Sequence, residues 1–463
     1  MLEKAQKILE KFSFKKGDFA DIRIEKGYGT SITIQNGRPE QISYDSDIGV
    51  GVRALIDGGW GFVSMVGNEV KEIEASLQKA IKIAKVTAIK CKEKGMIPEE
   101  YVFEGSNKVE YKIDPRDIPL EQKYEIVDEF EKTTRTYSDK IVSTNASMKN
   151  WFQKEIIVNS LGTKVENEYG NLNILCMATS REGDTMQNVY ISKGTTSGWE
   201  EIEKFDITSK GVELAERAIM LLNAEKPPSG KMDIVMDPSL VGVYVHESFG
   251  HAEEADSILA KDSILEGKMG KKLGSELINI YDDPTLPGLR GSYYYDSEGT
   301  KSVNRQLVKE GVQVGYLHSL ETAAKMNAIP NGAGRAMNFN HRPVVRMGNT
   351  YIDAGDHSFE ELLETIKNGV YLENSYGGYV DTAKGEFYFS AQGGHKIENG
   401  ELGAAIQNVS MSGLCLEVLE RTVAVGKDLE FAFPGSCGKA SQWVPVHAGG
   451  PPVAVKQIVV GGI

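Results

Sequence analysis

Two histidines and a glutamate lie close together in the stretch "VYVHESFGHAEEAD", which spans residues 243–256. His246 and His251 are five positions apart, and Glu247 directly follows the first of them. Imidazole nitrogens bind zinc, and a carboxylate beside a zinc ion can act as a general base on water. The stretch therefore indicates a hydrolytic metal site. The alternative interpretation is a pair of solvated or structural histidines.

The five-residue spacing sets a geometric condition on such a site. Each residue of an α-helix turns by about 100°, so side chains five positions apart point about 140° away from each other. On a regular helix, two such histidines do not share one ion. One extra residue in the turn, a π-bulge, removes this obstacle, and such bulges are common at functional sites. We therefore predict an i→i+5 distortion between His246 and His251, made easier by Gly250.

A zinc site needs at least one further protein ligand. Cys437 lies in "FPGSCGKASQ", a polar and glycine-flanked stretch in which a thiol is a poor core residue. Cys415 and Cys176 lie among apolar residues, which favours packing roles for both. The role of His447 stays open. From the residues alone, the candidates for the third ligand are Cys437, Cys415, His341, His395, His447, Glu253 and Glu254.

The motif is expected to lie on a helix at the start of a second domain. Residues 232–236 have the pattern of a strand, and Asp237 and Pro238 are a typical N-cap and first residue of a helix. The linker "KPPSGK" precedes this strand, and many glycine-punctuated strands follow the motif. One of these, "RMGNTYIDAG", is either a core strand or a strand whose edge pairs with an extended peptide.

The chain before the linker shows one order of elements twice. The first set consists of a helix, antiparallel strands with Asn-Gly and Asp-Gly turns, and a closing helix. The second set again consists of a helix, hairpins and a helix. This pattern predicts an α+β fold and suggests an internal duplication. We expect an N-terminal α+β domain over residues 1–225, with sub-units of about 1–95 and 110–225. A β-rich C-terminal domain over residues 231–463 then carries the metal-site helix.

The composition limits the partners and the compartment. The 463 residues carry a formal net charge of -14, and such an acidic chain repels phosphate backbones, so no nucleic-acid partner is expected. A signal peptide and a run of about eighteen apolar residues are both absent, so no membrane partner is expected. Four scattered cysteines do not form a disulfide framework. These features predict a cytoplasmic protein.

Four separated segments together resemble the TldD/PmbA family of zinc metalloproteases, historically labelled modulators of DNA gyrase: "VHESFGHAEEAD", "RMGNTYIDAG", "GGYVDTAKGEFYFSAQGG" and "SCGKASQWVPVHAGGPPVAVKQIVVGG". The resemblance implies that His246, His251 and Cys437 bind Zn²⁺ and that Glu247 is catalytic. It implies the catalytic type of subunit, because the other type lacks the His-Glu motif. It also implies unfolded or flexible peptides as substrates, and a dimer with a PmbA/TldE-like homologue or with a second copy.

Two other functions compete with a zinc peptidase. The first is a binding regulator of a topoisomerase, which would have no need of Glu247 beside an intact ligand set. The second is a scaffold whose zinc ion is structural. Structural zinc almost always takes four protein ligands, whereas only three are identified in this sequence. The intact set of three ligands and a glutamate therefore favours the peptidase.

Overall fold

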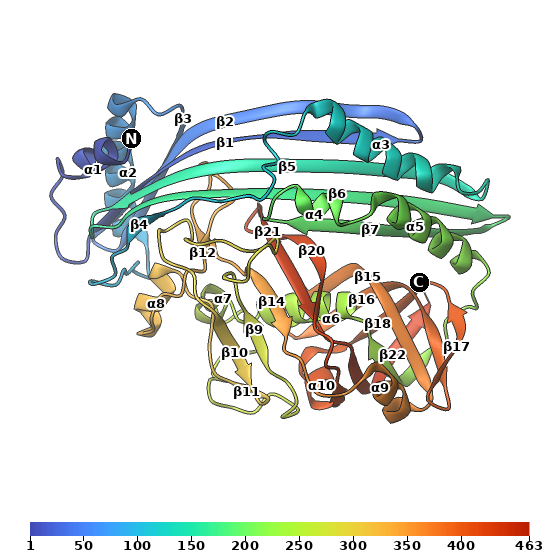
Figure 1. Ribbon diagram of the computed structural model, residues 1–463. Coiled ribbons are helices and arrows are strands. Elements are labelled where there is room, and N and C mark those ends of the chain that lie inside the picture. The colour runs from blue at the N-terminus through green and yellow to red at the C-terminus, as the bar shows by residue number, and fades with distance from the viewer. Residues whose placement is uncertain (463) are drawn as a thin grey trace.

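The computed structural model describes residues 1–462 and shows an α+β protein in two parts (Figure 1). A long curved sheet of N-terminal strands arches over a more compact part formed by the residues from Gly230 onward. The predicted fold class is confirmed: a sheet-plus-helices part comes first, and a β-rich part that carries the motif helix follows.

The N-terminal sheet has seven strands in the order β3-β2-β1-β5-β6, and β4 and β7 both pair with β6. Four of its strands are 17 to 19 residues long, about three times the average strand length. Positive φ angles in the turns at Asn36–Gly37 and Asp57–Gly58 confirm the hairpins predicted from these residue pairs. The strands are β1 (Phe19–Gln35), β2 (Arg38–Ile56), β3 (Gly59–Val66), β4 (Glu104–Asn107), β5 (Ile141–Asn159), β6 (Lys164–Glu182) and β7 (Thr185–Thr195).

Helices cover one face of this sheet at two places. Ile22 and Ile24 of β1 pack with the first two helices, and Ile32 and Ile34 pack with the later ones, as their spacing by two requires. The helices are α1 (Leu2–Leu9), α2 (Val70–Lys90), α3 (Leu120–Thr136), α4 (Glu200–Glu203) and α5 (Ile207–Leu222).

The predicted order of elements occurs twice: a helix, three antiparallel strands and a second helix. The first set is α1-β1-β2-β3-α2, and the second is α3-β5-β6-β7-α5. The two sets share one sheet because β1 pairs with β5 along fifteen residues, from Asp21↔Asn159 to Gln35↔Asn145. The division into sub-units of about 1–95 and 110–225, and the boundary before residue 231, remain proposals.

The other face of the sheet is polar where it meets the C-terminal part. Arg23 of β1 donates a hydrogen bond to the carbonyl oxygen of Asn338 at 2.8 Å. Arg53 of β2 forms buried ion pairs with Asp21 of its own sheet and, at 2.9 Å, with Glu298 of the C-terminal part. Because an unpaired buried charge is costly, these contacts hold the sheet in one position over the C-terminal part.

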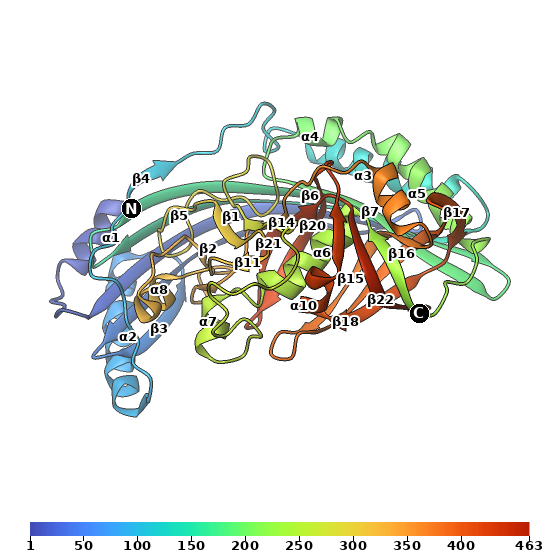
Figure 2. The ribbon, with the colours of Figure 1, turned by 90° about the horizontal axis from the view of Figure 1, so that it is seen from below.

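The C-terminal part contains two large sheets with a helix between them (Figure 2). The first has the order β11-β10-β9-β14-β21-β20; the second has the order β15-β8-β22-β18-β16-β17, with β19 paired to β22. The strands of the first sheet are β9 (Ile280–Asp282), β10 (Arg305–Lys309), β11 (Val312–Gln313), β14 (Asn349–Ile352), β20 (Glu430–Lys439) and β21 (Gln442–Gly450). Those of the second are β8 (Gly230–Met236), β15 (Gly369–Asp381), β16 (Glu386–Glu398), β17 (Glu401–Ile406), β18 (Val409–Leu414), β19 (Thr422–Val425) and β22 (Val453–Gly462). A small third sheet pairs β12 (Gly334–Arg335) with β13 (Val344–Val345).

The central helix, α6 (Pro238–Val245), packs against β14, β20 and β21 of one sheet and against β8, β15 and β16 of the other. Every residue from Ser239 to Val245 is buried, which explains the apolar run before the motif. The predicted start is confirmed, because Pro238 is the first residue and the Asp237 carboxylate accepts a hydrogen bond from Leu240 N at 2.7 Å. The other helical segments are η1 (His246–Gly250), α7 (Ala255–Leu259), α8 (Leu320–Met326), α9 (Phe359–Ile366) and α10 (Cys415–Glu420).

The segment "RMGNTYIDAG" is a core strand. Its strand β14 pairs with β9 on one side and with β21 on the other, so it offers no free edge to a peptide. The edge-strand interpretation is therefore wrong for this segment.

Within residues 1–462, no helix combines the length and the apolar character that crossing a membrane requires.

Candidate metal centre

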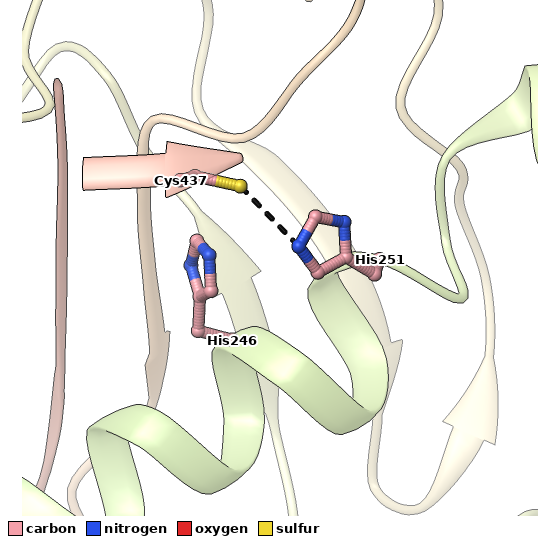
Figure 3. A group of neighbouring side chains, drawn as sticks. All are labelled: His246, His251 and Cys437. Atoms are coloured by element: carbon pink, nitrogen blue, oxygen red, sulfur yellow. Dashed lines mark hydrogen bonds between the residues drawn. The ribbon is translucent and has the colours of Figure 1, made fainter. Parts of the chain in front are cut away.

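The chain forms a π-helical turn at the motif. Helix α6 ends at Val245, and residues His246–Gly250 continue it as a π-helix. The amide nitrogen of His251 donates to the carbonyl oxygen of His246 at 3.2 Å, which is an i→i+5 hydrogen bond. The predicted distortion is confirmed. It brings the two imidazole rings to a centroid distance of 5.4 Å, on the same side of the helix (Figure 3).

A thiol from a distant segment completes a group of three donors. Cys437, on β20, lies above both imidazoles, and its Sγ is 3.3 Å from the Nε2 atom of His251 (Figure 3). One donor atom from each of His246, His251 and Cys437 lies within 4.8 Å of the others. The C-terminal segment of Cys437 thus reaches the motif helix, as a site shared by these three residues requires.

The geometry and the donor types fit zinc. Zinc–sulfur and zinc–nitrogen bonds of about 2.3 and 2.0 Å at a tetrahedral ion place the two donor atoms roughly 3.5 Å apart. The observed sulfur–nitrogen distance of 3.3 Å is close to that value. Two imidazoles and a thiolate suit a borderline-soft ion such as zinc and leave a fourth position for water or substrate.

Charges within the group favour the thiolate form of Cys437. Burial alone would raise the pKa of this thiol, but His246 and His251 outweigh burial and lower its pKa to about 4. Burial likewise opposes protonation of His251, yet Glu254 and Cys437 raise the pKa of this imidazole well above its usual value. The two imidazoles therefore favour the thiolate, which is the form of cysteine that binds metal ions.

Glu247 lies beside the donors without being one of them. Its Oε2 atom is 3.9 Å from Nε2 of His251, and 29% of its side chain is exposed to solvent. His246 and Cys437 are only 2% and 4% exposed. Glu247 therefore combines contact with the centre and access to water, as a general base requires.

Most other ligand candidates have separate hydrogen-bond partners. His341 Nδ1 is 2.8 Å from the Asn338 side chain, His395 pairs with Glu373 at 3.1 Å, and Glu253 contacts Gln313. Cys415 is a buried free thiol outside the donor group. None of these belongs to a cluster with metal-binding geometry in the part of the chain that the structure describes.

His447 has a structural role. Its Nδ1 atom accepts a hydrogen bond from the Arg290 amide at 3.1 Å, and its Nε2 donates to the carbonyl oxygen of Phe431 at 3.0 Å. Burial lowers the pKa of His447 to about 3, which keeps the ring neutral at physiological pH. Both ring nitrogens are occupied, so none is left for a metal.

Two charged residues that the sequence analysis had not assigned to the metal site lie next to the centre. The Glu254 carboxylate, which had been considered as a ligand, lies instead behind His251, at 3.0 Å from Nδ1. Lys439 contacts Glu254 at 3.0 Å and Asp256 at 2.7 Å. One signal was available for Lys439: residues two positions apart on a strand point to the same face, and Lys439 follows Cys437 by two.

Gly250 is needed for space rather than for conformation. Its backbone has no positive φ, and a Cβ atom at this position would lie 1.9 Å from Sδ of the buried Met347. We expect Gly250→Ala to lower the free energy of unfolding by about 1–3 kcal/mol, because the surrounding core has to shift. Urea unfolding measures this change.

Gly413→Ala is the matched control for this substitution, since the nearest atom to its Cβ, in Phe387, is 3.4 Å away. Equal unfolding energies for the two variants would contradict the argument. Met347→Ala combined with Gly250→Ala should cost less than the sum of the two single changes.

The comparisons with known proteins cover nearly the whole chain. Residues 20–84 match the PmbA/TldA metallopeptidase domain 1, residues 113–222 match its central domain, and residues 229–462 match its C-terminal domain. A metalloprotease of Methanocaldococcus jannaschii is 41% identical, with 97% of each chain covered. The zinc metalloprotease TldD homolog of Saccharolobus solfataricus is 28% identical, with 98% of this chain and 99% of the relative covered.

Solved structures share the fold. A Thermotoga maritima protein described as a modulator of DNA gyrase superimposes with a TM-score of 0.80 at 24% identity, covering 99% of this chain and 100% of that one. TldE from Thermococcus kodakarensis gives a TM-score of 0.77 at 16% identity, with 100% of both chains covered. The matched domains and the 41% identical relative, taken with the His, His and Cys cluster, show that the chain belongs to the PmbA/TldD family of metallopeptidases.

Proposed function

We propose that the chain is a zinc-dependent peptidase that hydrolyses unfolded or flexible peptides. His246, His251 and Cys437 would hold the ion, and Glu247 would be the general base. The observation that carries the proposal is the place of Glu247: it is 3.9 Å from a donor nitrogen, partly open to solvent, and outside the donor group. The name of the Saccharolobus solfataricus relative, a zinc metalloprotease, supports the choice of metal.

The residues divide the chemistry between them. Bound zinc would supply a Lewis acid that lowers the pKa of water and polarises a carbonyl group. Glu247 accepts the proton from the attacking water at its carboxylate and delivers it to the leaving amine. Cys437 contributes a negative charge to the centre, so a bound ion would be a weaker Lewis acid than one held by three neutral imidazoles.

The burial of the centre supports extended substrates. His246 and Cys437 are almost completely buried, and the side chains of His251 and Glu247 are only 15% and 29% exposed, so the surface of a folded domain has poor access to them. A flexible segment can enter where a folded surface cannot.

We also propose that the chain pairs with a PmbA/TldE-like homologue or with a second copy, which would shield the centre further. The shared fold with TldE supports this pairing, and light scattering under assay conditions tests it.

Removal of the metal tests the proposal directly. Dialysis against a chelator should abolish cleavage of an unfolded, fluorescently labelled protein, and adding one equivalent of zinc should restore it. A folded protein of similar size is the control substrate and should remain intact. Undiminished cleavage by metal-free protein would rule out the proposed function.

A further inference from the structure

The two imidazoles of the candidate centre differ in their surroundings. Within residues 1–462, the Nδ1 atom of His246 is buried and has no hydrogen-bond partner. The Nδ1 atom of His251 instead lies 3.0 Å from a carboxylate oxygen of Glu254. With Nδ1 directed at this carboxylate, Nε2 of the same ring is directed at Cys437 Sγ, 3.3 Å away. One of the two histidines is therefore oriented by a carboxylate.

Glu254 is itself held by a cation from the strand of the thiol ligand. The Glu254 side chain is 1% exposed, and its Oε2 atom is 3.0 Å from Nζ of Lys439. Lys439 belongs to β20, two residues after Cys437, and it also pairs with Asp256 and donates to the carbonyl oxygen of Val345 at 3.2 Å. A carboxylate this deeply buried requires such a partner to remain charged.

The contacts join two segments that are far apart in the sequence. Glu254 follows His251 by three residues, and the Lys439–Glu254 contact spans 185 positions. The ion pair therefore lies directly beside the contact between the thiol and His251, and it ties the motif segment to β20 independently of any metal.

We propose that the buried Glu254–Lys439 pair is the positioning device of the metal centre. Glu254 accepts the Nδ1 proton of His251 and so keeps the Nε2 lone pair directed at the ion. Lys439 holds Glu254 in place and anchors the strand of Cys437 to the motif segment. The inference rests on the ligand set of the proposed function but not on peptidase activity. Carboxylate partners of this kind typically contribute 10- to 100-fold to metal affinity.

Glu253 provides a matched control in the adjacent position. It is as buried as Glu254, but its carboxyl group contacts Gln313 and lies outside the donor group. Glutamine has nearly the size of glutamate, so Glu253→Gln removes a buried carboxyl group next to Glu254 in the sequence and leaves the carboxylate that faces His251 unchanged.

The test is the zinc affinity of the full-length protein, measured by competition with a chromophoric chelator after the metal has been stripped. Glu254→Gln should weaken zinc binding by about 10- to 100-fold, and Glu253→Gln should leave it unchanged. Lys439→Met should also weaken binding, because it leaves Glu254 as an unpaired buried charge. The double variant Glu254→Gln, Lys439→Met should lose less than the two single losses combined.

Cobalt substitution separates positioning from a general loss of stability. Co²⁺ in the site should give an altered visible spectrum in Glu254→Gln, because His251 is reoriented, and an unaltered spectrum in Glu253→Gln. Circular dichroism of the metal-free variants checks folding. If Glu254→Gln does not fold, Lys439→Arg, which changes the geometry but keeps the charge, provides the same comparison.

Wild-type zinc affinity in Glu254→Gln, or an equal loss in Glu253→Gln, would overturn the inference. Failure of the proposed function would appear differently. In that case the wild-type protein would bind zinc and show the expected differences between variants, but it would not cleave peptides.

Discussion

Glu247→Gln is expected to retain one zinc ion per chain and to lose about a hundredfold or more of peptidase turnover. Glutamine has nearly the size of glutamate but no carboxylate that can take a proton from water. Zinc should remain bound because Glu247 is not one of the three clustered donors. Metal analysis and steady-state cleavage of an unfolded substrate, measured on the same preparation, give both quantities.

Glu266→Gln is a suitable control, because this glutamate is an exposed residue after the motif segment and lies outside the donor group. It should cleave at the wild-type rate. Near-normal turnover in Glu247→Gln with zinc in place would refute the role of Glu247 as the base. The regulator of a topoisomerase, which needs no catalytic glutamate, would then become the better explanation of the fold.

Cys437→Ser is expected to lose the metal and the activity together. The thiolate is the only negatively charged donor of the group, and the hydroxyl that replaces it stays protonated at neutral pH. Loss of a residue that hydrogen-bonds to a metal ligand lowers metal affinity by up to about a hundredfold. Loss of the ligand itself should lower zinc affinity by more than that. Competition titration with a chelator measures this loss.

Cys91→Ser is the control for thiol removal, since Cys91 is a free, half-buried cysteine outside the donor group. It should bind zinc as the wild type does. The comparison of Cys437→Ser with Glu247→Gln is also informative, because Cys437→Ser should lose the zinc ion whereas Glu247→Gln should keep it. Full zinc binding by Cys437→Ser would exclude Cys437 from the ligand set.

The local features of the motif could be predicted because they follow from backbone periodicity. A regular helix turns by about 100° per residue, so the five-residue spacing of His246 and His251 required a π-bulge for a shared ion, and the bulge is present. The Asn-Gly and Asp-Gly turns and the Asp237 cap follow from equally local preferences and are also present. The reason given for Gly250 was wrong, since packing against Met347 requires it.

The long-range features had weaker signals in the sequence. The sequence predicted two repeats within one N-terminal domain, and it did not predict that β1 and β5 pair to join them into one sheet. From the sequence, the segment of β14 could be an edge strand or a core strand. It is a core strand because it pairs with β9 on one side and with β21 on the other. Strand pairing depends on which segments meet in space, and the alternation of residues along a strand does not specify its partner.

The sequence by itself determined the chemistry that the chain can offer: two histidines, a glutamate, and a spacing that works only on a distorted helix. The family resemblance pointed to Cys437, whereas residue types alone left seven candidates for the third donor. The tertiary structure places β20 beside the motif helix, and this brings the Cys437 thiol into contact with His251, 186 positions away in the sequence. It also places the Glu254 carboxylate at Nδ1 of His251, whereas Cys437 lies at Nε2; which ring nitrogen a carboxylate faces depends on packing, which the sequence does not specify.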